Sequence, residues 1–508
     1  MKKIFAMSLL LIMLFSLSAC DSSTQTSTSA QQSAPASSDV TETPVTEQLA
    51  EQPPIIERTV LFGNPLRFQG RLSPDGTKMS FRAPLNGVMN LWVGDRGDFS
   101  SVKSITSDTG RGIPSHFWAL DSQHVLYIQD QGGDENWHLY SVNLASGETI
   151  DLSPYEGTQA QMLAQSEKAP GIAIVGMNDR DPKWHDVYSV DLATGERTLL
   201  IENNGFASIL VDNNLKVRLA TQPTPSGGLQ VLSKNGDEWQ PLLEVAFEDV
   251  QTTNILGFDE DNQGVYLLDS RNRNTAALVH MSLADQKLTT IAESDRMDVS
   301  SVLIDPRSHK PFAYALDLIK PEYHAISIEY KDVIAKFNSQ LSGGSQVLAQ
   351  SLSNQFWTVY TDESDSSPVY KVFDASTGEF SDLFVTNPAL NELQLAKMHG
   401  VVIPSRDGME LVSYLTLPLE SDADKNGVPA SPVPMVMLVH GGPWGRDTFG
   451  YSPVVQWLAN RGYAVLQVNF RSSTGFGKDF LNAGNKQWSG DMHNDLLDAK
   501  KWAVEQGI

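Results

Sequence analysis

The sequence predicts two folded parts in series: a β-propeller of about seven blades, then the opening half of a doubly wound α/β domain. Two observations carry this prediction. From about residue 58 to 395, short alternating apolar runs are separated by turns rich in Asp, Asn, Gly and Ser. From residue 396 onward, longer apolar strands alternate with amphipathic helices, as they do in an α/β sheet. A chain of 508 residues is also long enough for more than one domain.

The propeller prediction depends on a repeated strand–turn–strand unit. Residues 134–154 (DENWHLYSVNLASGETIDLSP) match residues 181–201 (DPKWHDVYSVDLATGERTLLI), and residues 367–384 form a weaker copy. The glycine of each turn supplies the positive φ that a tight hairpin needs. A period of about 48 residues made only of strands is typical of one four-stranded blade per repeat, and the span then holds seven. An array of β-sandwiches is the alternative.

Charge and cysteine content exclude several classes of protein. The net charge is −24, so no basic surface is available to neutralise nucleic-acid phosphates. Cys20 is the one cysteine of the sequence, which excludes an intramolecular disulfide and a cysteine-based zinc site. The ten histidines show no H-E-x-x-H or H-x3–5-H pairing. We therefore expect no metal, no cofactor and no nucleic-acid partner.

Residues 1–20 have the features of a lipoprotein signal peptide. A basic start is followed by an apolar run over residues 4–17, which is too short to span a membrane comfortably. The run ends in Leu-Ser-Ala-Cys, which resembles a bacterial lipobox and predicts lipidation of Cys20. The alternative is an ordinary signal peptide with an incidental cysteine.

The segment after Cys20 predicts where the protein resides. Asp21 resembles an inner-membrane retention signal. Residues 21–57 are rich in Ser, Thr, Gln and Pro, and such a segment cannot bury enough apolar surface to fold, which predicts a disordered tether. We expect a periplasm-facing protein held at the inner membrane by the lipid anchor.

The α/β part, residues 396–508, begins with a predicted hairpin over residues 399–420 that turns at Arg-Asp-Gly. The apolar run MVMLVHGGP, residues 435–443, predicts a fully buried strand in the middle of a mostly parallel sheet, followed by a glycine-rich turn. A helix over residues 453–460 and a strand over residues 464–469 are expected next. The strongest helix, residues 489–507, has one apolar face, made of Met492, Leu496, Ala499 and Ala503.

A propeller followed by HGGPW, NFRSSTGFGKDF and WSGDMHNDLLDAKKW resembles the prolyl oligopeptidase family of serine peptidases, with most similarity to its acylaminoacyl-peptidase and dipeptidyl-aminopeptidase branch. The resemblance covers about residues 58–508. It implies that residues 396–508 are the N-terminal half of an α/β-hydrolase domain. It also implies hydrolysis of short peptides by a Ser-Asp-His triad, with the propeller restricting access.

The resemblance places the His-Gly-Gly-Pro turn in the position of the family's oxyanion loop. Gly441 or Gly442 is then the main-chain donor that stabilises the tetrahedral intermediate. The alternative is that these glycines only form a tight turn. Arg471 is expected to pair with Asp491 or Asp495 on the last helix. Family members usually have glycine at the position of Ser472, which leaves the local turn less certain.

The nucleophile motif G-x-S-x-G of α/β hydrolases does not occur in the sequence. Ser452 follows Gly450 but precedes Pro453 and Val454, and Ser345 has no predicted strand before it. The resemblance puts the nucleophile shortly after the last helix. We therefore expect the triad beyond Ile508, and the present chain to be an inactive fragment.

Two other functions remain open from the sequence. One is a propeller binding or scaffold lipoprotein with a vestigial hydrolase domain. The other is a carboxylesterase, because His-Gly-Gly loops also occur in esterases, although esterases usually cover the site with short helices.

Overall fold

A computed structural model describes residues 53–508 of the chain. Cys20 and Asp21, and with them the predicted signal peptide and most of the predicted tether, lie outside these residues. Residues 53–57, the end of the predicted tether, pack against the folded part of the chain. Ile56 is buried beside Leu61, and its amide donates to Asn460 Oδ1 at 2.7 Å. The following helix α1 (Arg58–Phe62) packs against α3 (Pro453–Ala459), because the apolar side chains of Ile56 and Leu61 are buried in the same cluster.

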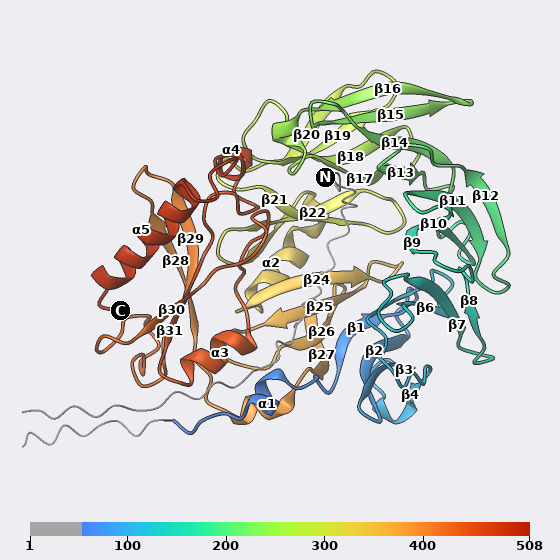
Figure 1. Cartoon of the computed structure of the whole chain (residues 1–508). Helices are drawn as coiled ribbons and strands as arrows, with labels where there is room; N and C mark the ends of the chain where they lie inside the picture. The colour runs from blue at the N-terminus through green and yellow to red at the C-terminus, as the bar shows by residue number, and fades with distance from the viewer. Residues whose placement is uncertain (1–52) are drawn as a thin grey trace, which may run out of the picture. The chain divides into compact units, whose positions relative to one another are not determined.

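Seven small antiparallel sheets follow one another in residues 68–385, as the seven-bladed propeller requires, and Figure 1 shows their strands in chain order. The first blade contains β1 (Phe68–Leu72), β2 (Lys78–Leu85), β3 (Val88–Asp95) and β4 (Lys103–Ser104), and the second contains β5 (Ser115–Trp118), β6 (His124–Gln129), β7 (His138–Asn143) and β8 (Thr149–Asp151). The third contains β9 (Ala160–Gln165), β10 (Ile172–Asp181), β11 (Trp184–Asp191) and β12 (Arg197–Ile201). The fourth contains β13 (Ser208–Val211), β14 (Val217–Pro223), β15 (Leu229–Asn235) and β16 (Glu238–Val245).

The last three blades have the same form, except that the sixth has three strands. The fifth blade contains β17 (Asn254–Phe258), β18 (Gly264–Asp269), β19 (Ala277–Ser282) and β20 (Leu288–Ala292), and the sixth contains β21 (Val299–Ile304), β22 (Pro311–Asp317) and β23 (Pro321–Ala325). The seventh contains β24 (Gly344–Gln350), β25 (Phe356–Asp362), β26 (Val369–Asp374) and β27 (Glu379–Val385). Short 3-10 turns lie at η1 (Phe99–Ser101), η2 (Phe247–Asp249), η3 (Ile328–Tyr330) and η4 (Pro388–Glu392).

The sequence repeat corresponds to one position in the blades. Its copies are the third strands β7, β11 and β26, each followed by the turn into the fourth strand. The turn glycines Gly147, Gly195 and Gly378 have φ of +74°, +73° and +77°. The prediction of a positive-φ hairpin glycine is confirmed, because only glycine adopts this conformation without a Cβ penalty.

The sixth blade has a helix after its third strand. α2 (Lys331–Ser339) packs on β23, and its apolar residues Ile334 and Phe337 are buried beside Trp357 of the next blade. Residues 321–325 therefore form a strand and residues 331–339 a helix, in a region that otherwise contains strands. The two buried residues, three apart, form the apolar stripe of a short helix.

Residues 398–468 form a separate mixed sheet with the order β28-β29-β31-β30. β28 (Met398–Pro404) and β29 (Glu410–Thr416) form the predicted hairpin, β29 pairs antiparallel with β31 (Ala464–Val468), and β30 (Met435–Leu438) pairs parallel with β31. The apolar run predicted as a strand over residues 435–443 forms a shorter strand, β30, which pairs only with β31 among residues 53–508. Within these residues β30 lies at the edge and is half-buried, whereas every residue of β31 is buried because strands flank it on both sides.

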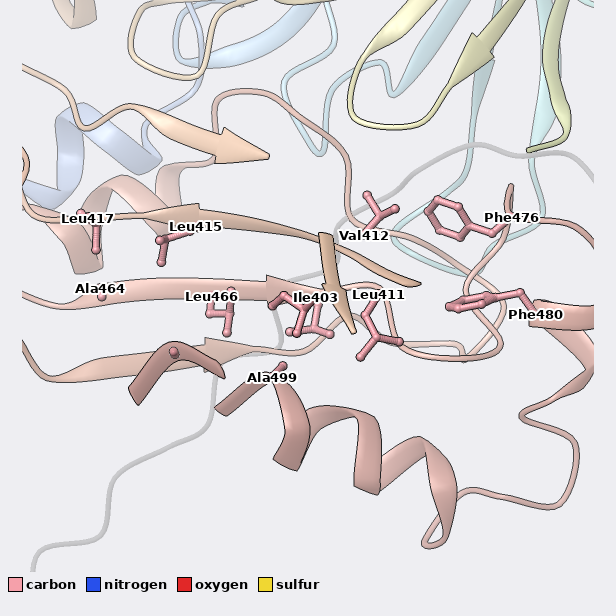
Figure 2. Packing of buried hydrophobic residues seen from close by; sticks show 12 residues of the cluster. Ile403, Leu411, Val412, Leu415, Leu417, Ala464, Leu466, Phe476, Phe480 and Ala499 are labelled. Atoms are coloured by element: carbon pink, nitrogen blue, oxygen red, sulfur yellow. The ribbon is translucent and has the colours of Figure 1, made fainter. Parts of the chain in front are cut away.

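The core of this sheet lies between the strands and helix α5 (Asp491–Glu505). Figure 2 shows Ala499 of α5 close to Leu411 and Leu466 of the sheet. Met492, Ala499 and Ala503 are buried and Leu496 packs on the same cluster, so the predicted apolar face is confirmed. The short helix α4 (Lys478–Asn482) was not predicted. No helix within residues 53–508 is long and apolar enough to cross a membrane.

Candidate functional site

In the loop after β30, the main-chain N–H groups of Gly441 and Gly442 have no hydrogen-bond partner among residues 53–508. Both glycines are exposed. Gly442 has a φ of +131°, and a Cβ at this position would approach the amide nitrogen of Trp444 to 2.6 Å. A Cβ on Gly441 would meet no atom within 4 Å. Only Gly442 requires glycine for steric reasons, whereas both amides are open to a ligand.

His440 holds the start of this loop. Its Nδ1 lies 2.9 Å from the carbonyl oxygen of Gly441 and therefore donates to it, while Nε2 lies 2.9 Å from Ser473 Oγ. The imidazole ring stacks on Phe470, with centroids 4.6 Å apart. Ser473 is fully buried, so it cannot attack a substrate, and its contact with His440 is structural. The hydrogen bond from Nδ1 orients the Gly441 carbonyl group and so fixes the start of the loop.

The far side of the loop is held by two charged residues. Arg446 donates to the carbonyl oxygens of Asp317 and Leu318 at 3.0 and 3.2 Å, and its guanidinium lies over the ring of Phe476. Asp447 accepts a hydrogen bond from Gln467 Nε2 at 2.9 Å. Burial raises the pKa of the Asp447 carboxyl group, and the hydrogen bond from Gln467 is the main effect that opposes this rise.

The segment after β31 also contacts the propeller. Lys478 Nζ lies 2.7 Å from Asp249 Oδ1, and the amide of Gly477 donates to Asp298 at 3.3 Å. Asp298 is largely enclosed, and burial raises the pKa of its carboxyl group. These contacts join the fifth and sixth blades to the loop that ends in α4.

A third propeller carboxylate contacts the start of α3. Asp362, at the end of β25, accepts from the amide of Tyr451 at 2.7 Å and from the Tyr360 hydroxyl at 3.4 Å. A Cβ on Gly450 would collide with this carboxylate. No cation pairs with Asp362 in the described part of the chain, and burial raises its pKa to about 7. Ser452 is the N-cap of α3, which gives this serine a structural role.

The predicted ion pair of Arg471 is present. Arg471 forms two short contacts with the fully buried Asp495, 2.7 Å from Nη2 to Oδ1 and 2.9 Å from Nε to Oδ2. Asp491 lies farther away, at 3.8 Å. Asp407, in the turn of the β28–β29 hairpin, adds a contact of 3.0 Å that the sequence did not reveal. The hydrogen bond to Asp495 is the main cause that raises the pKa of the guanidinium group.

Ser472 takes the left-handed conformation usual for glycine, with φ of +83°. Its hydroxyl group donates to the carbonyl oxygen of Leu481 at 2.8 Å and occupies the space where a Cβ of Gly484 would lie. The turn therefore keeps a glycine-like backbone with a serine in place. Further along the chain, Gly484 leaves room for the hydroxyl group.

Neither Ser345 nor any cluster of possible metal ligands forms a functional site within residues 53–508. Ser345 lies inside β24 and is buried, so it is not a nucleophile. No group of three or more His, Cys, Asp or Glu residues in the described part is arranged to hold a metal ion. Sequence reasoning missed the contacts between the propeller and the hydrolase part, which are made by Asp249, Asp298, Asp317 and Asp362. Single acidic residues in loops carry no periodic signal, so only the folded arrangement reveals these contacts.

The fold and the loop geometry define a propeller joined to an α/β-hydrolase-type sheet that presents free amides at the end of a parallel strand. Comparison with known proteins gives the family. The sequence pattern of the prolyl oligopeptidase family matches residues 449–508. Dipeptidyl aminopeptidase BIII of Pseudoxanthomonas mexicana is 44% identical over 456 residues, covering 89% of this chain and 66% of that protein. The chain belongs to the prolyl oligopeptidase family.

Two further similarities agree with this assignment. Dipeptidyl peptidase family member 6 of Caenorhabditis elegans is 31% identical over 488 residues, covering 89% of this chain and 66% of that protein. The solved structure of a puromycin-hydrolysing peptidase of Mycobacterium tuberculosis shares the fold, with a TM-score of 0.65, 13% identity and coverage of 90% of this chain and 74% of that one. The chain thus spans slightly less than two thirds of the length of the two curated relatives.

Proposed function

We propose that the whole protein is a serine peptidase that removes dipeptides from the free N-terminus of short peptides. The observation that carries this proposal is the similarity to two dipeptidyl peptidases along 89% of the chain. In this proposal the nucleophilic serine, the histidine and the aspartate follow Ile508. Its support is that the chain covers 66% of each relative and that the family pattern matches as far as residue 508.

In this mechanism, the present chain supplies part of the oxyanion hole. The serine hydroxyl attacks the peptide carbonyl while the histidine takes its proton, and the carbonyl oxygen becomes negatively charged. The free amide of Gly441 or Gly442 donates to that oxygen. His440 holds the Gly441 carbonyl group, and the contacts of Arg446 with the propeller hold the other end of the loop. A donor that is oriented before the reaction stabilises charge without reorganisation during it.

A pair of substitutions at Gly441 tests this role. Gly441→Pro removes the N–H group, and we expect kcat to fall by about 10²–10³ with little change in KM, as for the loss of one oxyanion donor. Gly441→Ala keeps the N–H group and adds a Cβ to open space, so it is the matched control and should retain activity. Equal activity in the two variants would show that the Gly441 amide is not a donor, and Gly442 would then be tested in the same assay.

Substrate comparison tests the proposed activity itself. The full-length protein should release p-nitroaniline from dipeptidyl substrates with a free amino group. It should act poorly on the same dipeptides with an acetylated N-terminus and on simple p-nitrophenyl esters. Preference for acetylated aminoacyl substrates would favour acylaminoacyl peptidase action, and preference for esters would favour a carboxylesterase. Absence of hydrolysis, with peptide binding retained, would favour a scaffold with a vestigial hydrolase domain. Residues 21–508 expressed alone should be inactive.

We also propose that the protein is a lipoprotein anchored through Cys20 and facing the periplasm. The support is the signal-like segment that ends in Leu-Ser-Ala-Cys and the presence of Asp21 after it. Metabolic labelling with a palmitate analogue should mark the full-length protein, and Cys20→Ser should abolish the label. Sucrose-gradient separation of the membranes tests whether Asp21 retains the protein in the inner one; label on Cys20→Ser would contradict the anchor.

A further inference from the structure

The first blade contains two guanidinium groups that have no acidic partner. Arg71 of β1 and Arg82 of β2 are half-buried, and neither forms an ion pair with a carboxylate of residues 53–508. Arg82 Nη1 donates to the carbonyl oxygens of Ile113, at 2.8 Å, and Pro114. The side chain of Arg71 donates no hydrogen bond to any described residue. The Nε atoms of both arginines are buried without a hydrogen-bond partner.

Arg67, just before β1, is also half-buried without an ion pair in the described part of the chain but lies over the rings of Phe81 and Phe99, whereas several half-buried arginines of the later blades are paired. Arg197, Arg218 and Arg271 each have a carboxylate oxygen within 2.7 to 2.9 Å. An interior guanidinium group without a counter-charge is costly, because burial removes water and gives nothing in return. In a chain with a net charge of −24, the absence of an acid beside two adjacent arginines is a specific feature of this site.

The groups around these arginines supply no negative charge. Burial lowers the pKa of both guanidinium groups, and the one titratable group that opposes this effect is the hydroxyl of Tyr370. Burial also raises the pKa of Tyr370 to about 12, so it is neutral near pH 7. His116 is fully buried, and burial together with the two arginines keeps its pKa low. The site therefore carries a net positive charge.

The position of the two arginines follows from the repeat of the propeller. In later blades, the second strand ends where the hydrolase part makes contact: Asp317 ends β22 beside Arg446, and Asp362 ends β25 beside Tyr451. Arg82 lies three residues before the end of β2, the second strand of the first blade, opposite Phe68 of β1. By this equivalence Arg82 lies toward the end of the blade that faces the hydrolase part, whereas Arg71 pairs with Ser80, nearer the start of β2.

The backbone between these residues is irregular. The pairing of β1 with β2 shifts between Phe68 and Arg71, and Gln69 has a φ of +53°. Such a bulge changes the direction of the side chains that follow it, and bulges are frequent next to binding sites. β1 also packs beside β5 and β24, the first strands of the two neighbouring blades. Arg71 thus lies on a strand of the first blade that contacts both neighbouring blades.

We propose that Arg71 and Arg82 form a subsite for the carboxylate group of a bound peptide. A guanidinium group presents a planar set of donors that matches a carboxylate in a bidentate manner. The free donors are those of Arg71 and the second terminal nitrogen of Arg82. The proposal rests on the proposed peptidase function for its choice of a peptide as the ligand, and the carboxylate is either the C-terminus or an acidic side chain.

Binding of matched peptides by the full-length protein tests the subsite without requiring turnover. Isothermal titration calorimetry would compare acetyl-Gly-Gly as the free acid with its amide, and acetyl-Gly-Glu amide with acetyl-Gly-Gln amide. We expect at least one acid to bind about tenfold or more tightly than its neutral partner, as for a hydrogen bond to a charged group. Preference in the first pair identifies the C-terminus, and preference in the second identifies the side chain.

Three variants separate the subsite from a general charge effect. Arg71→Met should remove the preference for the acid, and Arg71→Lys should retain part of it. Arg96→Met removes a positive charge from the same blade, where Arg96 lies over the ring of Phe356, and should leave the preference intact. Equal binding of acid and amide by the wild-type protein, or an unchanged preference in Arg71→Met, would overturn the proposal. A lack of hydrolysis with the preference retained would contradict only the proposed function.

Discussion

Arg471 and Arg71 both place a guanidinium group inside the protein, but their surroundings are opposite. Arg471, in the hydrolase part, meets Asp495 at 2.7 Å and Asp407 at 3.0 Å. Arg71, in the propeller, meets no carboxylate among the residues that the structure describes. The first charge is neutralised within the fold, and the second is available to a ligand. The partners of a buried charge, and not the residue type, therefore separate a structural role from a binding role.

The same contrast applies to two carboxylates. Asp495 is fully buried and accepts two hydrogen bonds from the side chain of Arg471. Asp362 has only neutral donors, the Tyr451 amide and the Tyr360 hydroxyl. Desolvation is then uncompensated by a cation, and the charge of Glu363 adds to the effect, so the pKa of Asp362 rises to about 7. The paired and the unpaired groups should therefore change the unfolding free energy differently when they are mutated or when the pH changes.

The largest effect is expected for Arg471→Ala. Removing the guanidinium group leaves Asp495 as an uncompensated buried charge, which costs about 3–5 kcal/mol of unfolding free energy. Urea unfolding of the full-length protein, followed by tryptophan fluorescence, measures this change. Arg406→Ala is the matched control, because Arg406 is half exposed and pairs with Asp498 at 2.9 Å, and solvent screening makes the loss of such a pair much less costly. Equal losses in the two variants would contradict the contrast between buried and exposed pairs.

Asp362→Asn should change the pH dependence of stability. The native pKa of about 7 lies above the ordinary value near 3.9, so the native state binds more protons between these values. The contribution of Asp362 is fully present below about pH 4 and is lost as pH rises through about 7, with a slope of at most about 1.4 kcal/mol per pH unit.

The asparagine variant removes this slope, because its amide is neutral and can still accept from Tyr451. Urea unfolding at several pH values from 4 to 8 measures the difference between the two proteins. An identical profile for wild type and variant would show that Asp362 titrates normally.

Arg71→Met should leave the unfolding free energy of the ligand-free protein within about 1 kcal/mol of wild type, because the substitution breaks no ion pair and keeps the apolar stem. The measurement is the same urea titration. A loss of several kcal/mol would reveal a carboxylate of the full-length protein already bound to Arg71. That result would also overturn the proposed subsite.

The smallest effect is expected for Asp407→Asn. The hydrogen bond from Arg471 holds the pKa of Asp407 at about 2, so its contribution is present above the ordinary value near 3.9 and is lost as pH falls through about 2. Asp407 is about half exposed, so solvent screening reduces the contribution to about 0.5–1 kcal/mol or less. Unfolding measured at pH 2 and pH 6 tests this; a difference at pH 2 as large as the one at pH 6 would contradict the assignment.

Several features could be predicted because they depend on short-range pattern. The turn glycines of the repeat identified the blades, since a two-strand hairpin restricts φ at one position. The pairing of Arg471 with the last helix followed from the family resemblance. The order of the strands could not be predicted, because an apolar run does not reveal its neighbours, and only the folded sheet shows that β31 lies between β29 and β30.

The site itself was predicted only in part. Gly441 and Gly442 were identified from their motif, but the steric need for glycine falls on Gly442 alone. Ser472 was noted as unusual, and the structure shows the left-handed φ that makes it so. The roles of His440, Asp407 and Arg71 were missed, because each depends on a residue at least 30 positions away in sequence, or on the absence of one.

The sequence by itself determined the two-part architecture, the number of blades, the hairpins and the apolar face of the last helix. These properties arise from the period of apolar residues and from the conformational limits of glycine, which act over a few residues. Only the tertiary structure decided which charges are neutralised. Coulombic pairing depends on distance and burial, and residues far apart in the chain come within about 3 Å only after the sheets have packed.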